Sequence, residues 1–225
     1  MIGWAQRRRI VVFSIFFIFI LVIGTFFVFK IWEPPQPAPP EGKDLSLLWT
    51  RFFEIRDGFV DAAALVENPN NFNVEKLKYS FKIYDKNNIL IAIKEGAAFA
   101  APFEKFIIFE PNIAISERVA GRVLVDLKDV VFGRNSANFL PKIDVLGTEK
   151  FLEDIFPRII VNIKNRDSQS FRNVQATIVV FDENQNAIAV SRTEIPFLGI
   201  GDEMSLVFTW PKSLNGVSYT EVFFK

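Results

Sequence analysis

The chain has 225 residues, of which half are hydrophobic and 26 are Phe, enough for one or two small domains beside a membrane segment. It contains no Cys and no His, which excludes disulfides and thiolate chemistry and removes the usual general base. The formal net charge is zero, but residues 1–32 carry four basic side chains and no acid. The other 22 basic and 26 acidic residues therefore give −4, and such a body has no electrostatic reason to bind nucleic acid. We expect a protein that is not an enzyme, uses no cofactor and has no metal site.

Residues Ile10 to Phe29 form an uncharged apolar run of 20 residues. As a helix this run would extend ~30 Å, the thickness of the hydrocarbon core of a bilayer. Three basic residues, Arg7 to Arg9, precede it, so the positive-inside rule places residues 1–9 in the cytoplasm. A cleaved signal peptide is the alternative, but its apolar part would span only roughly 7–15 residues and end at a small-x-small site. The sequence thus predicts a transmembrane helix over residues 10–32, with membrane contact through Ile10 to Phe29.

The location follows from this prediction. A retained anchor with a cytoplasmic N-terminus makes a single-pass plasma-membrane protein whose C-terminal domains lie outside the cytoplasm. The next segment, Glu33 to Gly42, reads EPPQPAPPEG, in which five of ten residues are Pro. Such a stretch favours polyproline II at ~3.1 Å per residue, a stalk of ~30 Å. The alternative is a ligand for an SH3-like groove, but we favour the spacer because that partner is not expected outside the cell.

The chain resembles itself when it is shifted by 97 residues. Asn68 then falls on Asn165, and Asp85 falls on Asp182, while apolar residues meet apolar ones from about Val60 to Ile93 without a gap. Identity is low, but spacing and residue class agree over much of each copy. An internal duplication explains this agreement, and it divides the body into residues 43–134 and 135–225.

Each copy has the alternating pattern of β-strands. Lys78 to Tyr84 places Tyr79, Phe81 and Ile83 on one face, and turn-forming residues follow at Asp85 to Asn88. The second copy has the same pattern over Val174 to Phe181, with its turn at Asp182 to Asn186. Short strands with frequent turns predict two tandem immunoglobulin-like antiparallel β-sandwiches, so the expected fold class is mainly β after an N-terminal transmembrane helix.

Three segments outside these patterns receive weaker assignments. Lys43 to Arg56 has the composition to start as a helical turn, and Glu149 to Ile155 is predicted as a second, short and peripheral one. Gly133 to Thr148 contains Asn, Pro and Gly and is the predicted joint between the two sandwiches.

The strand and turn motifs resemble two known families. Phe81-Lys-Ile-Tyr-Asp85 is similar to the signature of the bacterial FxLYD domain, and Ile178-Val-Val-Phe-Asp182 is a looser version. Ala64 to Asn70 reads ALVENPN and resembles the opening of the water-stress and hypersensitive-response (WHy) domain of late-embryogenesis-abundant proteins. The resemblance covers roughly Phe52 to Lys225 and implies immunoglobulin-like β-sandwiches, with no catalytic site to carry over. The resemblance to the bacterial domain also implies a prokaryote, so the C-terminal domains are expected in the periplasm or on the cell surface.

Two recurrent polar patterns each have a functional and a structural interpretation. Asp182 to Asn186 begins like a calcium loop, but Ala187 and Thr193 stand where such a loop needs Gly and Glu, so a hairpin turn is favoured. Asn68 and Asn165 end an apolar strand in each copy. An Asx turn explains them better than a ligand contact, because both copies share the residue.

The remaining candidates are carboxylates and aromatic residues. Asp202 and Glu203 follow Gly201 and are expected to form a turn before the strand Met204 to Trp210, not a catalytic pair. Four Phe residues could fill the core or form an exposed binding patch. They are Phe99, Phe103, Phe106 and Phe109. The small apolar stretch Glu95 to Pro102 is either a sheet edge or an interdomain contact.

These observations favour a non-enzymatic binding or structural role in the cell envelope, with another envelope protein as the partner and strand addition as one binding mode. The alternative is a stress-protective protein, by analogy with the water-stress domain. A hydrolase of cell-wall glycans that uses only carboxylates is the least favoured hypothesis.

Overall fold

The computed structural model describes residues 3, 15–25, 41–133, 140–152 and 156–225. Contacts divide the chain into two compact units, Met1–Ala38 and Pro39–Lys225. Most of the predicted proline-rich spacer and of the basic N-terminal segment, including Arg7 to Arg9, lies outside the described residues. The location that this segment predicts is therefore untested.

The predicted transmembrane helix is not supported. The only helix among the described residues covers residues 15–25, and its side chains are exposed. It extends about 16 Å at 1.5 Å per residue, roughly half of what a bilayer core requires. Within the described part of the chain, no helix has both the length and the apolar character needed to cross a membrane. The fold-class prediction was therefore wrong in its helix, while its mainly β part is confirmed by the strands below.

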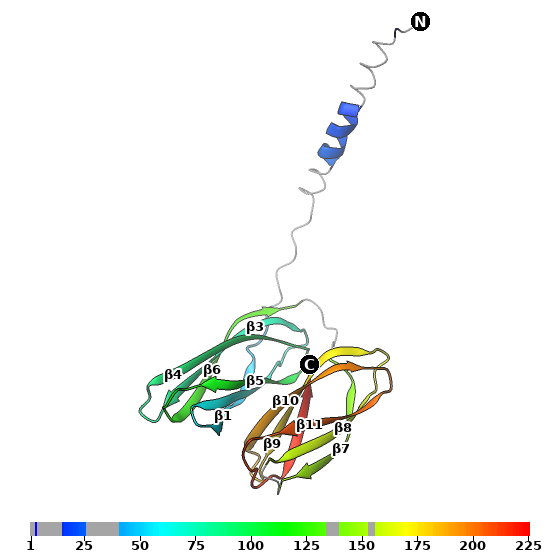
Figure 1. Cartoon of the computed structure of the whole chain (residues 1–225). Coiled ribbons are helices and arrows are strands. Elements are labelled where there is room, and N and C mark those ends of the chain that lie inside the picture. The colour runs from blue at the N-terminus through cyan, green and yellow to red at the C-terminus, as the bar shows by residue number, and fades with distance from the viewer. Residues whose placement is uncertain (1–2, 4–14, 26–40, 134–139, 153–155) are drawn as a thin grey trace. The chain divides into compact units, whose positions relative to one another are not determined.

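Six strands form the first β unit, in two three-stranded antiparallel sheets (Figure 1). Sheet A has the order β1-β2-β5 and sheet B the order β4-β3-β6. The strands are β1 (Ser46–Arg56), β2 (Phe59–Glu67), β3 (Val74–Asp85), β4 (Leu90–Ala100), β5 (Lys105–Ala114) and β6 (Ala120–Phe132).

The second β unit repeats this arrangement. Sheet C has the order β11-β8-β7 and sheet D the order β10-β9-β12, so adding six to each strand number of the first unit gives the second. The strands are β7 (Ile143–Phe151), β8 (Arg158–Asn165), β9 (Phe171–Phe181), β10 (Ala187–Leu198), β11 (Glu203–Thr209) and β12 (Tyr219–Phe224). An identical order of six strands agrees with the duplication inferred from the 97-residue shift.

Each unit has its own apolar core between its two sheets. In the first unit, even-numbered residues of β2 pack against odd-numbered residues of β3. Phe81 of β3 and Phe106 of β5 are among the largest fully buried side chains of this core. In the second unit, Ile163, Ile178 and Phe208 occupy the corresponding interior. Full burial of such side chains contributes about 1.5–3 kcal/mol each, so each core is a main source of stability.

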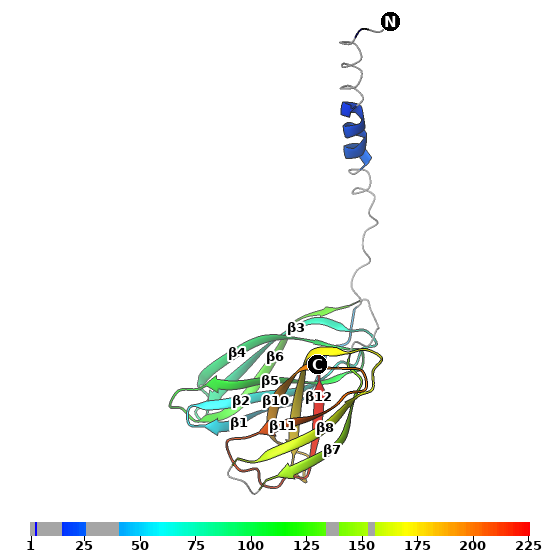
Figure 2. The same ribbon diagram turned by 45° about the vertical axis from the view of Figure 1, so that its right-hand side comes forward.

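A third core joins the two units through sheets A and D. Its buried residues include Ala63 of β2, Phe109 of β5 and Val179 of β9, and the rings of Phe181 and Tyr219 stack at 4.7 Å beside them. The inner sheets are therefore covered on both faces, whereas sheets B and C each keep a face in solvent (Figure 2). Strand β2 shows this directly, because all of its residues from Val60 to Val66 are buried.

The structure corrects two local predictions. Most of Lys43 to Arg56, predicted as a possible helical turn, forms β1, and Glu149 to Phe151 end β7 instead of starting a helix. Register shifts interrupt both strands, between Leu47 and Trp49 in β1 and between Val145 and Gly147 in β7. A bulge changes which face the next side chain occupies, and this hid the period of two in the sequence.

Candidate ligand-binding cleft between the two β units

The repeated Asn side chains are structural. Asn68 is fully buried, and its Nδ2 donates to the carbonyls of Phe72 and Ala101 at 2.9 and 2.8 Å. Asn165 donates in the same way to the carbonyls of Gln169 and Gly199, at 2.9 and 2.8 Å. In both copies Oδ1 accepts from the main-chain N–H two residues later. The prediction of an Asx turn at both positions is confirmed.

The repeated Asp residues each close a hairpin. Asp85 Oδ1 accepts from the N–H groups of Asn87 and Ile89, and Asp182 Oδ1 accepts from those of Asn184 and Asn186, at 2.7–2.9 Å. The side-chain amide of Asn186 also donates to Asp182 Oδ2 at 3.0 Å, and this bond with the main-chain bonds holds the pKa of the Asp182 carboxyl below the ordinary range. For Asp85 the main-chain bond from Ile89 contributes most to the lowered pKa. The hairpin interpretation of the calcium-like motif is thus confirmed. Over the described ranges, no cluster of three or more acidic side chains is arranged to hold a metal ion.

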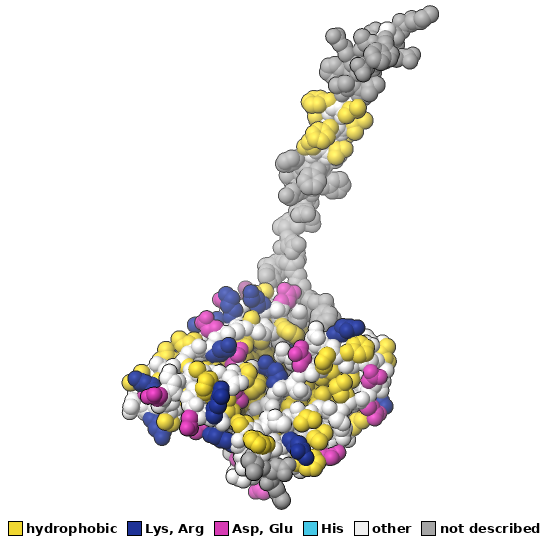
Figure 3. Space-filling view, viewed as in Figure 1, with side chains coloured by type: hydrophobic (Ala, Val, Ile, Leu, Met, Phe, Trp, Pro, Cys, Tyr) yellow, Lys and Arg dark blue, Asp and Glu magenta, His cyan; other side chains and the backbone are white. Residues whose placement is uncertain are grey.

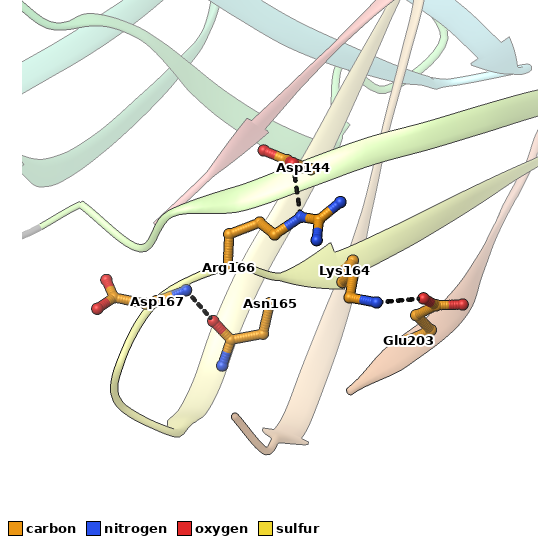
Figure 4. A network of polar contacts seen from close by, with 6 residues as sticks. All are labelled: Asp144, Lys164, Asn165, Arg166, Asp167 and Glu203. Carbon is orange, nitrogen blue, oxygen red and sulfur yellow. Dashed lines mark hydrogen bonds and ion pairs between the residues drawn. The ribbon is translucent and has the colours of Figure 1, made fainter. Parts of the chain in front are cut away.

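The outer face of sheet C carries ion pairs close to Asn165 (Figure 4). Lys164 Nζ of β8 lies 2.7 Å from Glu203 Oε1 of β11. Arg166, which directly follows β8, has its Nε 2.9 Å from Asp144 Oδ2 of β7. Asp202 forms the predicted turn with Gly199, and Glu203 begins β11. These exposed groups have the character of a solvated sheet face, where ion pairs contribute little stability.

A cleft opens where the interface between sheets A and D ends beside the edge strands β4 and β5. Its volume is about 440 Å³, within the range of small ligand sites. One wall is Ala97 to Phe99 and Phe106 to Phe109, and the other comes from β9, β10 and Lys225. The space-filling view shows the face of this body hollowed between its two halves, with basic side chains in the hollow (Figure 3).

The sequence period explains why the cleft is polar on one wall. Odd-numbered residues of β9 face sheet A, and those inside the interface, such as Val179, are apolar. Further along the same face come Thr177 and then Gln175, which line the space where the two sheets separate. One face of one strand therefore supplies both the apolar contact and the polar lining.

Arg192 is the central charged group of the cleft. Its Nη2 donates to the carbonyl of Phe109 at 2.7 Å and its Nε to Thr177 Oγ1 at 3.3 Å, and its guanidinium lies 5.1 Å from the centre of the Phe109 ring. Desolvation lowers the pKa of this guanidinium, and electrostatic interaction with Glu110 and Tyr79 partly offsets that decrease. Among the described residues, no carboxylate lies within ion-pair distance of Arg192.

The neighbouring cation is already paired. Lys225 Nζ lies 3.3 Å from Glu104 Oε1, donates to the carbonyl of Phe99, and lies 4.4 Å from the ring centres of Phe99 and Phe106. Desolvation raises the pKa of the Glu104 carboxyl and lowers that of the Lys225 ammonium, while their attraction opposes both shifts. This pair ties the second unit to the loop between β4 and β5.

The four Phe residues divide between the predicted roles. Phe106 belongs to the first core and Phe109 to the interface between the units, whereas Phe99 and Phe103 are 52% and 67% exposed. The small apolar stretch Glu95 to Pro102 meets both of its alternatives, because β4 is an edge strand and its Phe99 contacts Lys225 of the second unit.

A second cleft of about 440 Å³ lies on the opposite edge of the interface, beside β1. Arg51 crosses it and donates to Asn186 Oδ1 at 2.6 Å. Asp61 also lines it, and desolvation raises the pKa of its carboxyl although Oδ1 accepts from the N–H of Asn112 at 2.8 Å. Arg51 and Asp61 are thus engaged by protein partners, and Glu54 and Lys212 also line this cleft. The cleft at Arg192 is the better candidate site, because its guanidinium is partly desolvated there and the exposed ring of Phe99 lines the same cleft.

This site was not predicted from the sequence. Arg192 and Gln175 belong to no sequence motif that indicates a binding site, because an Arg or Gln on a strand is most often a solvated residue. The duplication contained one usable signal: at the position of Arg192 the first copy has Glu95, so the second copy alone places a cation here.

Comparison with known proteins adds no identification. No protein-family model matches the sequence, and no curated protein matches it at a significant level. The resemblance to the FxLYD and water-stress domains stays a prediction from short motifs.

Proposed function

We propose that this chain is a non-enzymatic binding protein whose ligand occupies the cleft beside Arg192. The observation that carries the proposal is a preformed cleft at an apolar junction of two β units, with Arg192 in its wall and no carboxylate of the described residues within ion-pair distance of it. Ligand sites favour such junctions, and a cleft fixed by packing requires little ordering when the ligand binds.

The repeated Asn and Asp side chains, which were the other candidate site residues, stabilise turns of the fold. Asn68 and Asn165 satisfy turn carbonyls, while Asp85 and Asp182 close hairpins. For a glycan hydrolase, two carboxylates would have to stand ~5–10 Å apart. Glu104 lines the small space beside the cleft, and Glu110 interacts electrostatically with Arg192. Six residues along an extended chain separate the main chains of these two Glu residues by about 20 Å. Their spacing therefore gives the hydrolase hypothesis no support.

The stress-protective alternative rests on the Asn68-Pro69-Asn70 motif. Asn70 is buried and exchanges hydrogen bonds with the main chain of Lys43 at 2.8 and 2.9 Å. The motif thus has a local structural role, and no described feature favours protection over binding. A place in the cell envelope stays a prediction from the sequence.

The test is crosslinking of the full-length chain in cells, followed by affinity purification and mass spectrometry. The informative variant is Gln175→Trp, because Gln175 lines the cleft and an indole there fills it. The matched control is Gln169→Trp on an exposed turn. We expect one dominant partner that is lost in Gln175→Trp and kept in Gln169→Trp. A partner that survives filling of the cleft would contradict the proposal.

A further inference from the structure

The free edge of β5 faces the cleft. The main-chain N–H of Asn68 donates to the main-chain carbonyl of Glu104 at 2.9 Å, and this bond fixes the first hydrogen-bonded pair of the β2–β5 ladder. The register Val66↔Phe106 and Ala64↔Ile108 continues without a shift, so alternate peptide groups, those of Ile107 and Phe109, face away from β2. The bond from Arg192 to the Phe109 carbonyl agrees with this direction.

No strand covers this edge in the described part of the chain. Sheet A ends at β5, and Ile107 lines both the cleft and a smaller space of about 40 Å³ behind it. The N–H and C=O of Ile107 are thus offered to whatever fills the cleft. A half-buried main-chain edge of this kind is the template on which an extended peptide adds as a further strand.

The charge in the cleft indicates what such a peptide carries. Lys225 is neutralised by Glu104, but Arg192 is not paired, and its Nη1 has no hydrogen-bond partner among the described residues. A guanidinium binds a carboxylate by charge-assisted hydrogen bonds, and a partly desolvated one gains most from it. The exposed ring of Phe99 and the side chain of Gln175 flank the same space.

We propose that the cleft binds an extended peptide segment with a carboxylate, its main chain pairing with β5 at Ile107 and its carboxylate on Arg192. This inference rests on the binding function proposed above and specifies its ligand. The carboxylate comes from an acidic side chain or from a peptide C-terminus, and both sources present the same group to Arg192.

The test uses two phage-displayed libraries of random octapeptides, selected on the full-length chain. One library is displayed internally, and the other ends in a free carboxyl group. We expect enriched peptides from at least one library that bind Arg192→Gln at least tenfold more weakly. Binding to the matched variant Arg172→Gln stays unchanged, because Arg172 lies over the exposed ring of Phe197 outside the cleft. Acidic residues enriched in the internal library indicate a side-chain source, and enrichment confined to the free-carboxyl library indicates a C-terminus.

A second measurement tests strand addition. N-methylation of single peptide bonds in a selected peptide should weaken binding at least tenfold at alternate positions only, because only alternate N–H groups face β5. Failure to select any Arg192-dependent peptide, or selection of peptides without a carboxylate, would overturn this inference. The proposed binding function would still stand if the cellular partner were lost in Gln175→Trp, so the two failures are distinguishable.

Discussion

Phe103 and Gly201 adopt the same left-handed backbone conformation, with φ of 55° and 75°, at equivalent turns of the two β units. Each turn lies between the carbonyl that the buried Asn reaches and the acid that precedes the next strand. Glycine adopts this conformation without strain, whereas a bulky residue does not. The first copy therefore holds an exposed aromatic side chain at a position where the second copy has the residue that the backbone prefers.

Phe103→Gly should stabilise the protein. The Phe103 side chain is 67% exposed and loses little burial, while relief of the left-handed strain should raise the free energy of unfolding by up to about 1 kcal/mol. Denaturant unfolding of the full chain measures this change. The reciprocal variant Gly201→Ala should lower stability by a similar amount, and a destabilised Phe103→Gly would contradict the account.

Replacement of either buried Asn should be costly. Asn68→Ala and Asn165→Ala each leave turn carbonyls and an N–H without a partner in a buried site, so we expect losses of about 2–3 kcal/mol. Asn68→Ala should lose more, because Asn70 Nδ2 also donates to Asn68 Oδ1 at 3.0 Å. Asn87→Ala on an exposed turn serves as the control. A loss below about 0.5 kcal/mol at either buried position would show that water replaces the amide.

Acid should weaken the two hairpin turns. Because hydrogen bonds hold the folded-state pKa of Asp85 and Asp182 below the ordinary value of 3.8, the unfolded chain binds more protons in that range. The stability from these groups is present above pH 3.8 and is lost as the pH falls towards the folded-state pKa values. The double variant Asp85→Asn and Asp182→Asn keeps oxygen acceptors that do not titrate. Unfolding free energies from about pH 5 to about pH 2 should thus fall less steeply than in the native chain.

The control for this prediction is Asp57→Asn, which removes an exposed carboxylate at a turn between β1 and β2. Its acid profile should match that of the native chain. An unchanged slope in the double variant would mean that the turn hydrogen bonds do not depend on the carboxylate charge.

The elements with local signals were predictable from the sequence. Alternation from Lys78 to Tyr84 and the turn residues after Asp85 gave the β3–β4 hairpin, and the 97-residue shift gave its counterpart. Asn68 and Asn165 were assigned to turns because a residue that recurs in both copies is more simply structural. The alternation and the turn residues lie within a few residues of each other, and the repeat is found by comparing the sequence with itself, so none of these signals depends on tertiary contacts.

The arrangement of the four sheets was not predictable. Asp61-Ala62-Ala63-Ala64 lacks the apolar contrast between faces that normally marks a half-buried strand, because β2 is covered on both sides. Nothing local shows that sheet A packs on sheet D. The cleft is a consequence of that packing, so Arg192 and the edge of β5 could not be brought together from the sequence.

The packing of sheet A on sheet D is the claim on which the site depends. Because the chain has no Cys, spin labels can be placed at Asn87→Cys and Asn184→Cys, on the exposed hairpins of the two units. The disrupting variant is Ala63→Glu, which places a charge in the interface and leaves both unit cores intact. Its control is Ala114→Glu, at an exposed position at the end of β5 that lines neither cleft.

The most direct measurement is the distance distribution between these two labels by pulsed electron spin resonance, in the otherwise native full-length chain. The account predicts one narrow distribution, which Ala63→Glu broadens and Ala114→Glu leaves unchanged. A broad distribution in the native chain would show that the two β units move independently, and the preformed cleft would then not exist.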